Sequence, residues 1–426
     1  MAASIPIFIS AGEDSGDLYG ALLIQALRQR LGNIEVFGCG GEKMRAAGCE
    51  TVVDARQIAM VGIVEVIPGL PRVWKAFRRL LATLRDRRPA LAVLIDFPDF
   101  NLRLAKKLKR AGIQVVYFIA PQVWAWRRGR LAALRRDVDH LLCIFPFEEE
   151  FFRRAGVEAK FVGHPLVGRV APSLTASQFR SRLGVAENLP LIALLPGSRR
   201  REISLNLPPM LETARSIARS GEFSFILAAA SAEAGEAIRT QLRHQLGDAG
   251  QRFLVVENLT YDAVAHAEAA VVASGTATIV TALLGTPMVV VYRVTRATWL
   301  LGRRLVQTPY FSMVNLVAGR RIVPEFIQAE FQPEMVAGAV VKLLQNPAVS
   351  QLMRRELLEV VGRLSAPNAG PPAAGWLNPL PLGQSPAPEK DSHRSVLLPG
   401  SGDAIERSVS LTESVLRGRF SLEGNF

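Results

Sequence analysis

Short apolar runs alternate with stretches of helical periodicity along the first half of the chain. Runs of about five uncharged residues are typical of buried strands, and longer amphipathic stretches are typical of helices. The pattern predicts strands at 5–10, 35–38, 91–96 and 115–119, and helices at 17–30, 74–87 and 101–111. Strand and helix in this repeated order indicate a parallel α/β sheet.

The same alternation starts again after a pause at 163–165 and 171–177. We therefore expect two Rossmann-like, doubly wound domains, at 1–170 and 171–364. Ligands of such sheets bind beyond the carboxyl ends of the strands, so we also expect a cleft between the domains. The second half predicts strands at 190–195, 223–229, 253–256, 269–273 and 288–292, and helices at 205–219, 232–246, 276–284, 334–345 and 349–362.

The end of the chain has a different composition. Residues 365–402 hold many Pro, Gly and Ser residues, which do not favour a packed core. We expect the tail 365–426 to be disordered, with at most a marginal helix near 408–416.

The charge of the chain indicates an anionic partner. The 426 residues carry a formal net charge of +13, which suits nucleic acid, a membrane surface or a phosphorylated substrate. Nucleic acid is not favoured, because we see neither an aromatic–basic single-strand platform nor a helix-turn-helix pattern. No signal peptide and no apolar run of about 18 residues is visible, so we expect a cytoplasmic protein with peripheral membrane contact.

Metal and cofactor motifs are missing from the sequence. Cys39, Cys49 and Cys143 have no metal-like spacing, and we interpret them as reduced thiols. The chain has no GxGxxG or P-loop motif after a strand, which argues against nicotinamide cofactors and ATP. We expect no metal and no cofactor.

Carboxylates follow two of the predicted strands in the first half. Glu13 lies in the small-residue segment 10–17, where Ser15 and Asp17 could cap the next helix. The residues of segment 10–17 fit a sugar-binding turn and a helix cap equally well. Asp96 follows an apolar strand and is harder to explain as a cap than Asp99 or Asn101. We therefore favour Asp96 as a general base or an orienter of an acceptor hydroxyl.

Two turns in the second half suit a phosphate or diphosphate. In each of them a strand runs into small residues and then a helix, whose first N–H groups can bind an anion. Three consecutive arginines strengthen the first turn, whereas the second turn is weak by itself. The candidate residues are Gly197, Ser198 and Arg199 in the first turn, and Ser274, Gly275 and Thr276 in the second.

Apolar and aromatic residues beside arginines suit a membrane interface or an acylated ligand. They occur in the segment 60–88, which has an apolar and a cationic face. In the loop 121–128, two tryptophans beside two arginines could form an amphipathic platform for a sugar or an anionic group. The alternative interpretation, without a ligand or a membrane, is a core helix with one solvent-exposed face. The candidate acceptor or membrane residues are Met60, Val61, Ile63, Val66, Trp74, Trp124, Trp126 and Arg127.

Taken together and in this order, the motifs resemble the lipid-A-disaccharide synthase family. They include AGEDSGD at 11–17, MVGIVEV at 60–66, IDFPDFN at 95–101, PQVWAWR at 121–127, LLPGSRRREI at 194–203, SGTAT at 274–278 and SMVNLVAGR at 312–320. The resemblance covers roughly residues 5–364. Three departures are Val280, where the family usually has a glutamate, Gly168, where an aspartate is common, and the tail from about Ser365.

The resemblance implies a GT-B fold and a metal-independent, inverting glycosyl transfer in lipid A biosynthesis. The donor would be UDP-2,3-diacylglucosamine, and the acceptor would be 2,3-diacylglucosamine 1-phosphate (lipid X). The enzyme would act on the inner face of the inner membrane. Asp96 would be the base, Glu13 and Asn315 match family positions implicated in activity, and the two turns would bind the diphosphate. The alternatives are a GT-B enzyme with another UDP-sugar and lipid acceptor, and a catalytically impaired membrane-binding relative.

Overall fold

The computed structural model describes residues 4–59, 66–125, 128–246, 253–302, 308–365 and 403–423. These residues divide into two compact units. The first unit contains the residues up to Pro165 together with 403–423, and the second contains Leu166–Leu364. The division falls beside the Gly-His-Pro segment at 163–165.

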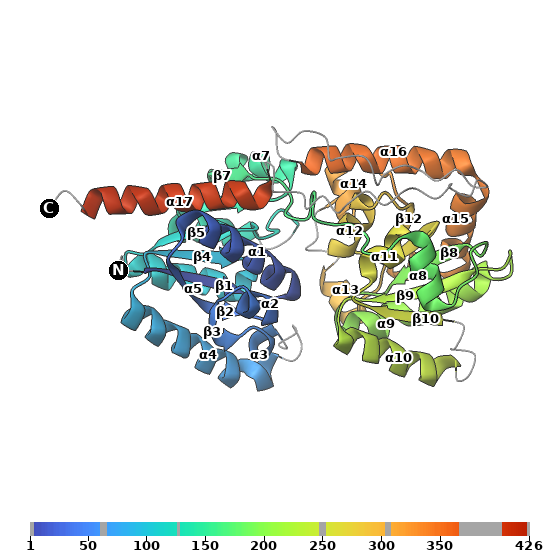
Figure 1. Cartoon of the computed structure of the whole chain (residues 1–426), viewed down its shortest axis with the longest axis horizontal. Helices are drawn as coiled ribbons and strands as arrows, with labels where there is room; N and C mark the ends of the chain where they lie inside the picture. Colours follow the sequence, from blue (N-terminus) through green and yellow to red (C-terminus); the bar gives the residue numbers. More distant parts are fainter. Residues whose placement is uncertain are drawn as a thin grey trace. The chain divides into compact units, whose positions relative to one another are not determined.

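The first unit is built on a seven-stranded, parallel sheet in the order β3-β2-β1-β4-β5-β6-β7 (Figure 1). Its strands are β1 (Ile5–Ala11), β2 (Ile34–Gly40), β3 (Glu50–Asp54), β4 (Leu91–Ile95), β5 (Gln114–Phe118), β6 (His140–Cys143) and β7 (Ala159–Phe161). Its helices are α1 (Asp14–Leu31), α2 (Glu42–Ala46), α3 (Arg56–Ala59), α4 (Val66–Arg87), α5 (Pro98–Arg110), α6 (Leu131–Asp137), α7 (Pro146–Arg154) and α17 (Ala404–Glu423).

The second unit has a six-stranded, parallel sheet in the order β10-β9-β8-β11-β12-β13. Its strands are β8 (Leu191–Leu195), β9 (Ser224–Ala229), β10 (Phe253–Glu257), β11 (Ala269–Ala273), β12 (Met288–Tyr292) and β13 (Glu325–Ile327). Its helices are α8 (Ala176–Leu183), α9 (Arg200–Ile217), α10 (Ala232–Leu246), α11 (Thr260–Ala265), α12 (Thr276–Leu283), α13 (Arg296–Gly302), α14 (Met313–Ala318), α15 (Pro333–Gln345) and α16 (Pro347–Leu364).

The central strands explain why the sequence shows apolar runs instead of alternation. Every residue of β4, β8 and β11 is buried, because helices cover both faces of each sheet. All the predicted strands are present. The short strands β3, β6, β7 and β13 were not predicted, because runs of three to five residues give little periodicity.

The strand order reverses once in each sheet. In the first unit the chain runs from β1 outward to β2 and β3, and then returns to place β4 on the other side of β1. In the second unit β8, β9 and β10 are followed by β11 on the other side of β8. Such reversals are the switch points at which open α/β sheets bind ligands.

The end of the chain differs from the expectation. Residues 366–402 lie outside the described residues, but α17 is a long helix that packs on α1 of the first unit (Figure 1). Ile405, Val409 and Leu416, at helical spacing, are buried there, and Glu413 pairs with Arg30 at 2.7 Å. An isolated helix with so weak a pattern is marginal, and tertiary packing stabilises it.

Candidate active site

Four candidate turns follow the four strands that flank the two switch points. Segment 10–17 follows β1 and segment 95–101 follows β4, and these two strands are neighbours in the first sheet. Segments 194–203 and 273–278 follow β8 and β11, which are neighbours in the second sheet. The structure therefore brings the motifs together in pairs at the carboxyl edges of the sheets, where ligands of this fold bind.

Asn101 joins the two turns of the first unit. Its amide is fully buried on α5, where its oxygen accepts a hydrogen bond from Ser10 Oγ at 2.7 Å. Its Nδ2 lies 3.2 Å from the Ser10 carbonyl oxygen and 2.8 Å from that of Asp96. Asn101 was expected at most to cap its own helix. Instead, it couples the ends of β1 and β4.

Asp96 lies in a strained turn. Asp96 and Phe97 both have positive φ, 45° and 51°, which side-chain-bearing residues adopt only at a cost of about 1–3 kcal/mol. The Tyr117 hydroxyl donates to the Asp96 carbonyl oxygen at 2.6 Å, and the Phe97 ring covers Gly12. A Cβ atom on Gly12 would lie 2.2 Å from that ring, so only glycine fits there. These contacts hold the partly exposed Asp96 at the strand end.

Glu13 and Asp17, both from the first motif, have different environments. Glu13 takes the N-cap position of α1 with extended backbone and is partly exposed. Asp17 is buried and accepts hydrogen bonds from the backbone N–H groups of Gly41 at 2.6 Å and Lys43 at 2.9 Å. The expectation that Asp17 caps its own helix is therefore wrong, because its carboxylate caps α2 instead.

Trp124 does not form the exposed platform that the sequence suggested. Its side chain is buried, and its indole N–H donates to Glu148 Oε1 at 2.9 Å. Glu148 Oε2 also accepts from the backbone N–H groups of Ile144 at 3.2 Å and Phe145 at 3.1 Å. The Glu148 carboxylate thus ties the loop after β5 to the end of β6.

Glu148 is a buried titratable group that the sequence analysis did not single out. Burial raises its pKa to about 7, although the Trp124 indole and the two backbone N–H groups oppose this rise. The charge of Asp96 adds to the rise. The only local signal was its position in the first turn of α7, where a glutamate can bind the backbone preceding the helix.

In the second unit, the turn after β8 contains an internal anion. Glu202, in the first turn of α9, accepts from the backbone N–H groups of Ser198 at 3.2 Å and Arg199 at 3.4 Å. Gly197 has a φ of 118°, and a Cβ atom there would lie 2.7 Å from the Glu202 side chain. The Glu202 carboxylate thus closes a capping box at the start of α9, in the turn for which the sequence predicted a diphosphate.

The turn after β11 is more open. Gly275 has a φ of 148°, and no atom lies within 4 Å of the position that a Cβ atom would take. Thr276 begins α12 and is exposed, whereas Val280 is buried. The Ser274 hydroxyl donates to the Phe311 carbonyl oxygen at 2.7 Å, so this side chain links the turn to a second loop.

Asn315 is fully buried near the start of α14 and uses its whole hydrogen-bonding capacity within the protein. Its Oδ1 accepts from the backbone N–H groups of Ile322 at 2.7 Å and Val323 at 3.0 Å. Its Nδ2 donates to the Val323 carbonyl oxygen at 2.9 Å and to Glu325 Oε1 at 2.7 Å. This geometry does not suit a substrate-contacting role and favours a positioning role.

Only some of the predicted acceptor and membrane residues are among those that the structure describes. Trp74 on α4 is 60% exposed, and the Arg78 guanidinium lies 5.0 Å from the centre of its ring. A shallow hollow of about 570 Å³ lies along Pro71, Trp74, Lys75 and Arg78. Val66 belongs to α4, but its side chain is not described. Met60, Val61, Ile63, Trp126 and Arg127 lie outside the described residues.

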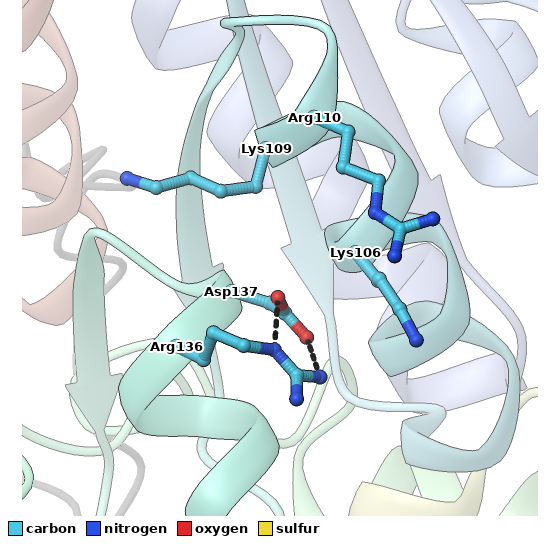
Figure 2. A pocket seen from close by; sticks show the side chains of 5 residues that line it. All are labelled: Lys106, Lys109, Arg110, Arg136 and Asp137. Carbon is cyan, nitrogen blue, oxygen red and sulfur yellow. Dashed lines mark hydrogen bonds and ion pairs between the residues drawn. The ribbon is translucent and has the colours of Figure 1, made fainter.

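A basic hollow of about 280 Å³ lies away from these turns, between the ends of α5 and α6 (Figure 2). It is lined by Lys106, Lys109, Arg110, Arg136 and Asp137. Figure 2 shows Arg136 bonded twice to Asp137, at 2.8 and 2.6 Å. Because α5 and α6 end where β5 and β6 begin, this hollow lies at the amino edge of the sheet. We therefore do not assign it to the active site.

Membrane-spanning helices and metal-binding clusters are both missing from the described residues. None of the helices there combines the length and the apolar character needed to cross a bilayer. Likewise, that part of the chain contains no group of three or more His, Cys, Asp or Glu side chains suited to a metal ion.

Solved structures with a similar fold include nucleotide-sugar enzymes. A putative UDP-N-acetylglucosamine 2-epimerase from Listeria monocytogenes aligns with a TM-score of 0.57 at 13% identity, over 83% of this chain and 91% of that one. The calicheamicin glycosyltransferase CalG4 aligns with a TM-score of 0.50 at 15% identity, over 85% of this chain and 96% of that one. At such identities the likeness concerns the fold alone, which is the two-unit α/β architecture called GT-B.

Sequence relatives are much closer. The lipid-A-disaccharide synthase of Solibacter usitatus is 46% identical over 365 residues, covering 86% of this chain and 94% of that protein. The lipid-A-disaccharide synthase of Myxococcus xanthus is 42% identical over 381 residues, covering 89% and 98%. The model of the lipid-A-disaccharide synthetase family matches residues 7–366. The chain therefore belongs to the lipid-A-disaccharide synthase family of glycosyltransferases.

Proposed function

We propose that this chain joins UDP-2,3-diacylglucosamine to 2,3-diacylglucosamine 1-phosphate and releases UDP. One observation carries the proposal: the four candidate turns lie in pairs at the two switch points. One pair carries carboxylates, and the other carries helix N-termini with arginine. An acid–base site and an anion site are the two parts that glycosyl transfer from a nucleotide donor requires.

In this mechanism Asp96 accepts the proton of the acceptor hydroxyl as its oxygen attacks the anomeric carbon of the donor. The bond from that carbon to the diphosphate oxygen breaks, and UDP leaves with the electron pair. Attack opposite the leaving group inverts the anomeric configuration. The strained turn supports this role, because it holds Asp96 at the strand end while leaving the side chain partly exposed. Glu13, at the neighbouring strand end, would accept hydrogen bonds from sugar hydroxyl groups.

The charge of the leaving diphosphate would be balanced without a metal. The proposed binding groups are the first N–H groups of α9 and α12 and the guanidinium of Arg199. The diphosphate would replace the Glu202 carboxylate, which in this structure accepts from the Ser198 and Arg199 N–H groups. The proposed donor residues are Gly197, Ser198, Arg199, Ser274, Gly275 and Thr276.

Both substrates are acylated, so the enzyme would collect them at the cytoplasmic face of the inner membrane. The middle of α4 suits that contact, because Trp74 is exposed beside Lys75 and Arg78. Tryptophan sits favourably at a membrane interface, and cationic side chains attract anionic lipids. The contact would be peripheral.

The test is UDP release by purified protein with both acylated substrates in detergent micelles, with mass-spectrometric detection of the disaccharide product. Asp96→Asn is the matched variant, because asparagine tolerates the left-handed backbone that Asp96 adopts. Turnover in the native protein that vanishes in Asp96→Asn would support the reaction and its base. UDP binding without turnover would favour an impaired relative, and turnover with another UDP-sugar alone would favour a different transferase.

A further inference from the structure

A buried glutamate lies behind the turn after β11. Glu325, the first residue of β13, is 4% exposed. Its carboxylate accepts three hydrogen bonds: from the backbone N–H groups of Phe311 at 3.1 Å and Ser312 at 2.8 Å, and from Asn315 Nδ2 at 2.7 Å. A buried carboxylate is tolerated only when it is bound in this way. The three donors are therefore held to one another through Glu325.

The loop that Glu325 holds is bonded directly to the proposed donor turn. The Phe311 N–H group binds Glu325, while the Phe311 carbonyl oxygen accepts from the Ser274 hydroxyl at 2.7 Å. Ser274 immediately precedes Gly275, whose φ of 148° sets the turn into α12. A continuous set of hydrogen bonds thus runs from Asn315 through Glu325 and Phe311 to Ser274.

Neighbouring contacts limit how the loop can move. Ser312 Oγ accepts from the Asn315 backbone N–H group at 3.1 Å and so caps α14. The Phe311 ring lies 6.0 Å from the Trp299 ring. Asn315 also hydrogen-bonds the backbone of Val323, which lies just before β13. Loss of the Glu325 carboxylate would remove the acceptor of three donors, two of which belong to the buried residues Ser312 and Asn315. A buried donor without an acceptor is costly, so the loop would be displaced.

We propose that Glu325 is a positioning residue for the nucleotide donor, acting through Phe311 on the Ser274 turn. Asn315 belongs to the same network, so its importance would come from orienting Glu325 and not from touching a substrate. This inference rests on the proposed function, because it takes the turn after β11 as part of the UDP site. It predicts a defect confined to donor binding, with acceptor binding unchanged.

The test combines Glu325→Gln, Ser274→Ala and the double variant in calorimetric UDP titrations. The glutamine amide can accept from only part of the donor set, so we expect UDP affinity to fall about ten-fold. Ser274→Ala is expected to weaken UDP binding by about three- to ten-fold, and the double variant by no more than the larger single effect. Such non-additivity is what a shared network requires. If Glu325→Gln does not fold, Glu325→Asp takes its place in the same cycle.

Thr286→Val is the matched control. Thr286 is also buried in the second unit and donates through its hydroxyl to the Val264 carbonyl oxygen at 2.7 Å, outside this network. It should lower the melting temperature while leaving UDP affinity within about two-fold. In turnover assays Glu325→Gln should raise the KM of the donor and leave the KM of the acceptor unchanged.

Two results would overturn the inference. One is a Glu325 variant that melts earlier but binds UDP like the native protein, and the other is full additivity with Ser274→Ala. Failure of the proposed reaction has a separate signature, namely native protein that binds UDP and responds to these variants but does not release UDP from the acylated donor. Native protein that does not bind UDP would remove both proposals together.

Discussion

The carboxyl edges of the two sheets have the same topology and opposite chemistry. In the first unit the edge carries Glu13 and Asp96, and in the turn after β4 the positive φ values fall on Asp96 and Phe97. In the turns after β8 and β11 of the second unit they fall on Gly197 and Gly275. Strained side-chain-bearing residues hold a functional group in place, whereas glycine lets a ligand approach the backbone. In the proposed mechanism, the same architecture would serve proton transfer in one unit and anion binding in the other.

In each unit a buried glutamate holds a loop near the carboxyl edge of the sheet. Glu148 and Glu325 are both buried, and each accepts from two consecutive backbone N–H groups and one side-chain N–H group. Glu148 fastens the loop that carries Trp124, and Glu325 fastens the loop that binds Ser274. In each unit a loop beside the candidate site is held by a carboxylate that the substrate need not touch.

The largest effect is expected for Asp96→Asn. Removal of a general base lowers kcat by about 10²–10⁴-fold, and we expect about a 10³-fold loss here. UDP affinity should stay within about two-fold, because Asp96 belongs to the first unit and the proposed diphosphate site to the second. Steady-state kinetics and UDP titration check this division, and a parallel loss of UDP affinity would contradict it.

The next effect concerns the pH dependence of stability. Burial raises the Glu148 pKa to about 7 from 4.5, so the folded state holds this proton more tightly than the unfolded state. The tighter binding of this proton stabilises the folded state by at most about 3 kcal/mol. This stabilisation is fully present below pH 4.5 and is lost as the pH rises through 7. Urea unfolding of native protein and Glu148→Gln from pH 4.5 to 8 measures it. A difference between the two proteins that does not change with pH would refute the raised pKa.

Arg199→Gln should weaken UDP binding by about ten- to hundred-fold, since a charge-assisted hydrogen bond contributes about 1.5–3 kcal/mol. Arg201→Gln is the control, because Arg201 is exposed in the first turn of α9, two residues after Arg199, and the change should alter UDP affinity by less than about three-fold. Equal losses in the two variants would mean that general positive charge, and not the turn geometry, attracts the diphosphate.

The smallest effect is expected at the membrane contact. Trp74→Ser should reduce binding to vesicles that contain anionic lipid by about three- to ten-fold, because one exposed indole contributes modestly to interfacial binding. UDP affinity should not change, because Trp74 lies in the first unit. Vesicle co-sedimentation measures the effect, and unchanged partitioning would remove α4 from the proposed membrane contact.

Much of the fold could be predicted from the sequence because periodicity is local. Fully apolar strands and amphipathic helices identified the parallel α/β sheets. Small residues after strands marked three of the four turns, and a carboxylate after a strand marked the fourth. Prediction was weaker for side chains whose partners are distant in sequence. Asn101 forms a hydrogen bond with Ser10, which is 91 residues away in the sequence. Trp124 is buried and donates a hydrogen bond to Glu148. No local pattern distinguishes a buried, bonded tryptophan from an exposed one.

The sequence by itself determined the class of fold, the order of its motifs and the family to which the chain belongs. Those properties depend on residue types and short spacings. Only the tertiary structure decided which strands are neighbours, and therefore which motifs meet at a switch point. It also showed that Asn315, a candidate catalytic residue, is fully buried, which favours a positioning role. The packing of α17 on α1 was likewise visible only in the structure. The physical reason is that burial and hydrogen-bond satisfaction depend on partners that only folding brings together.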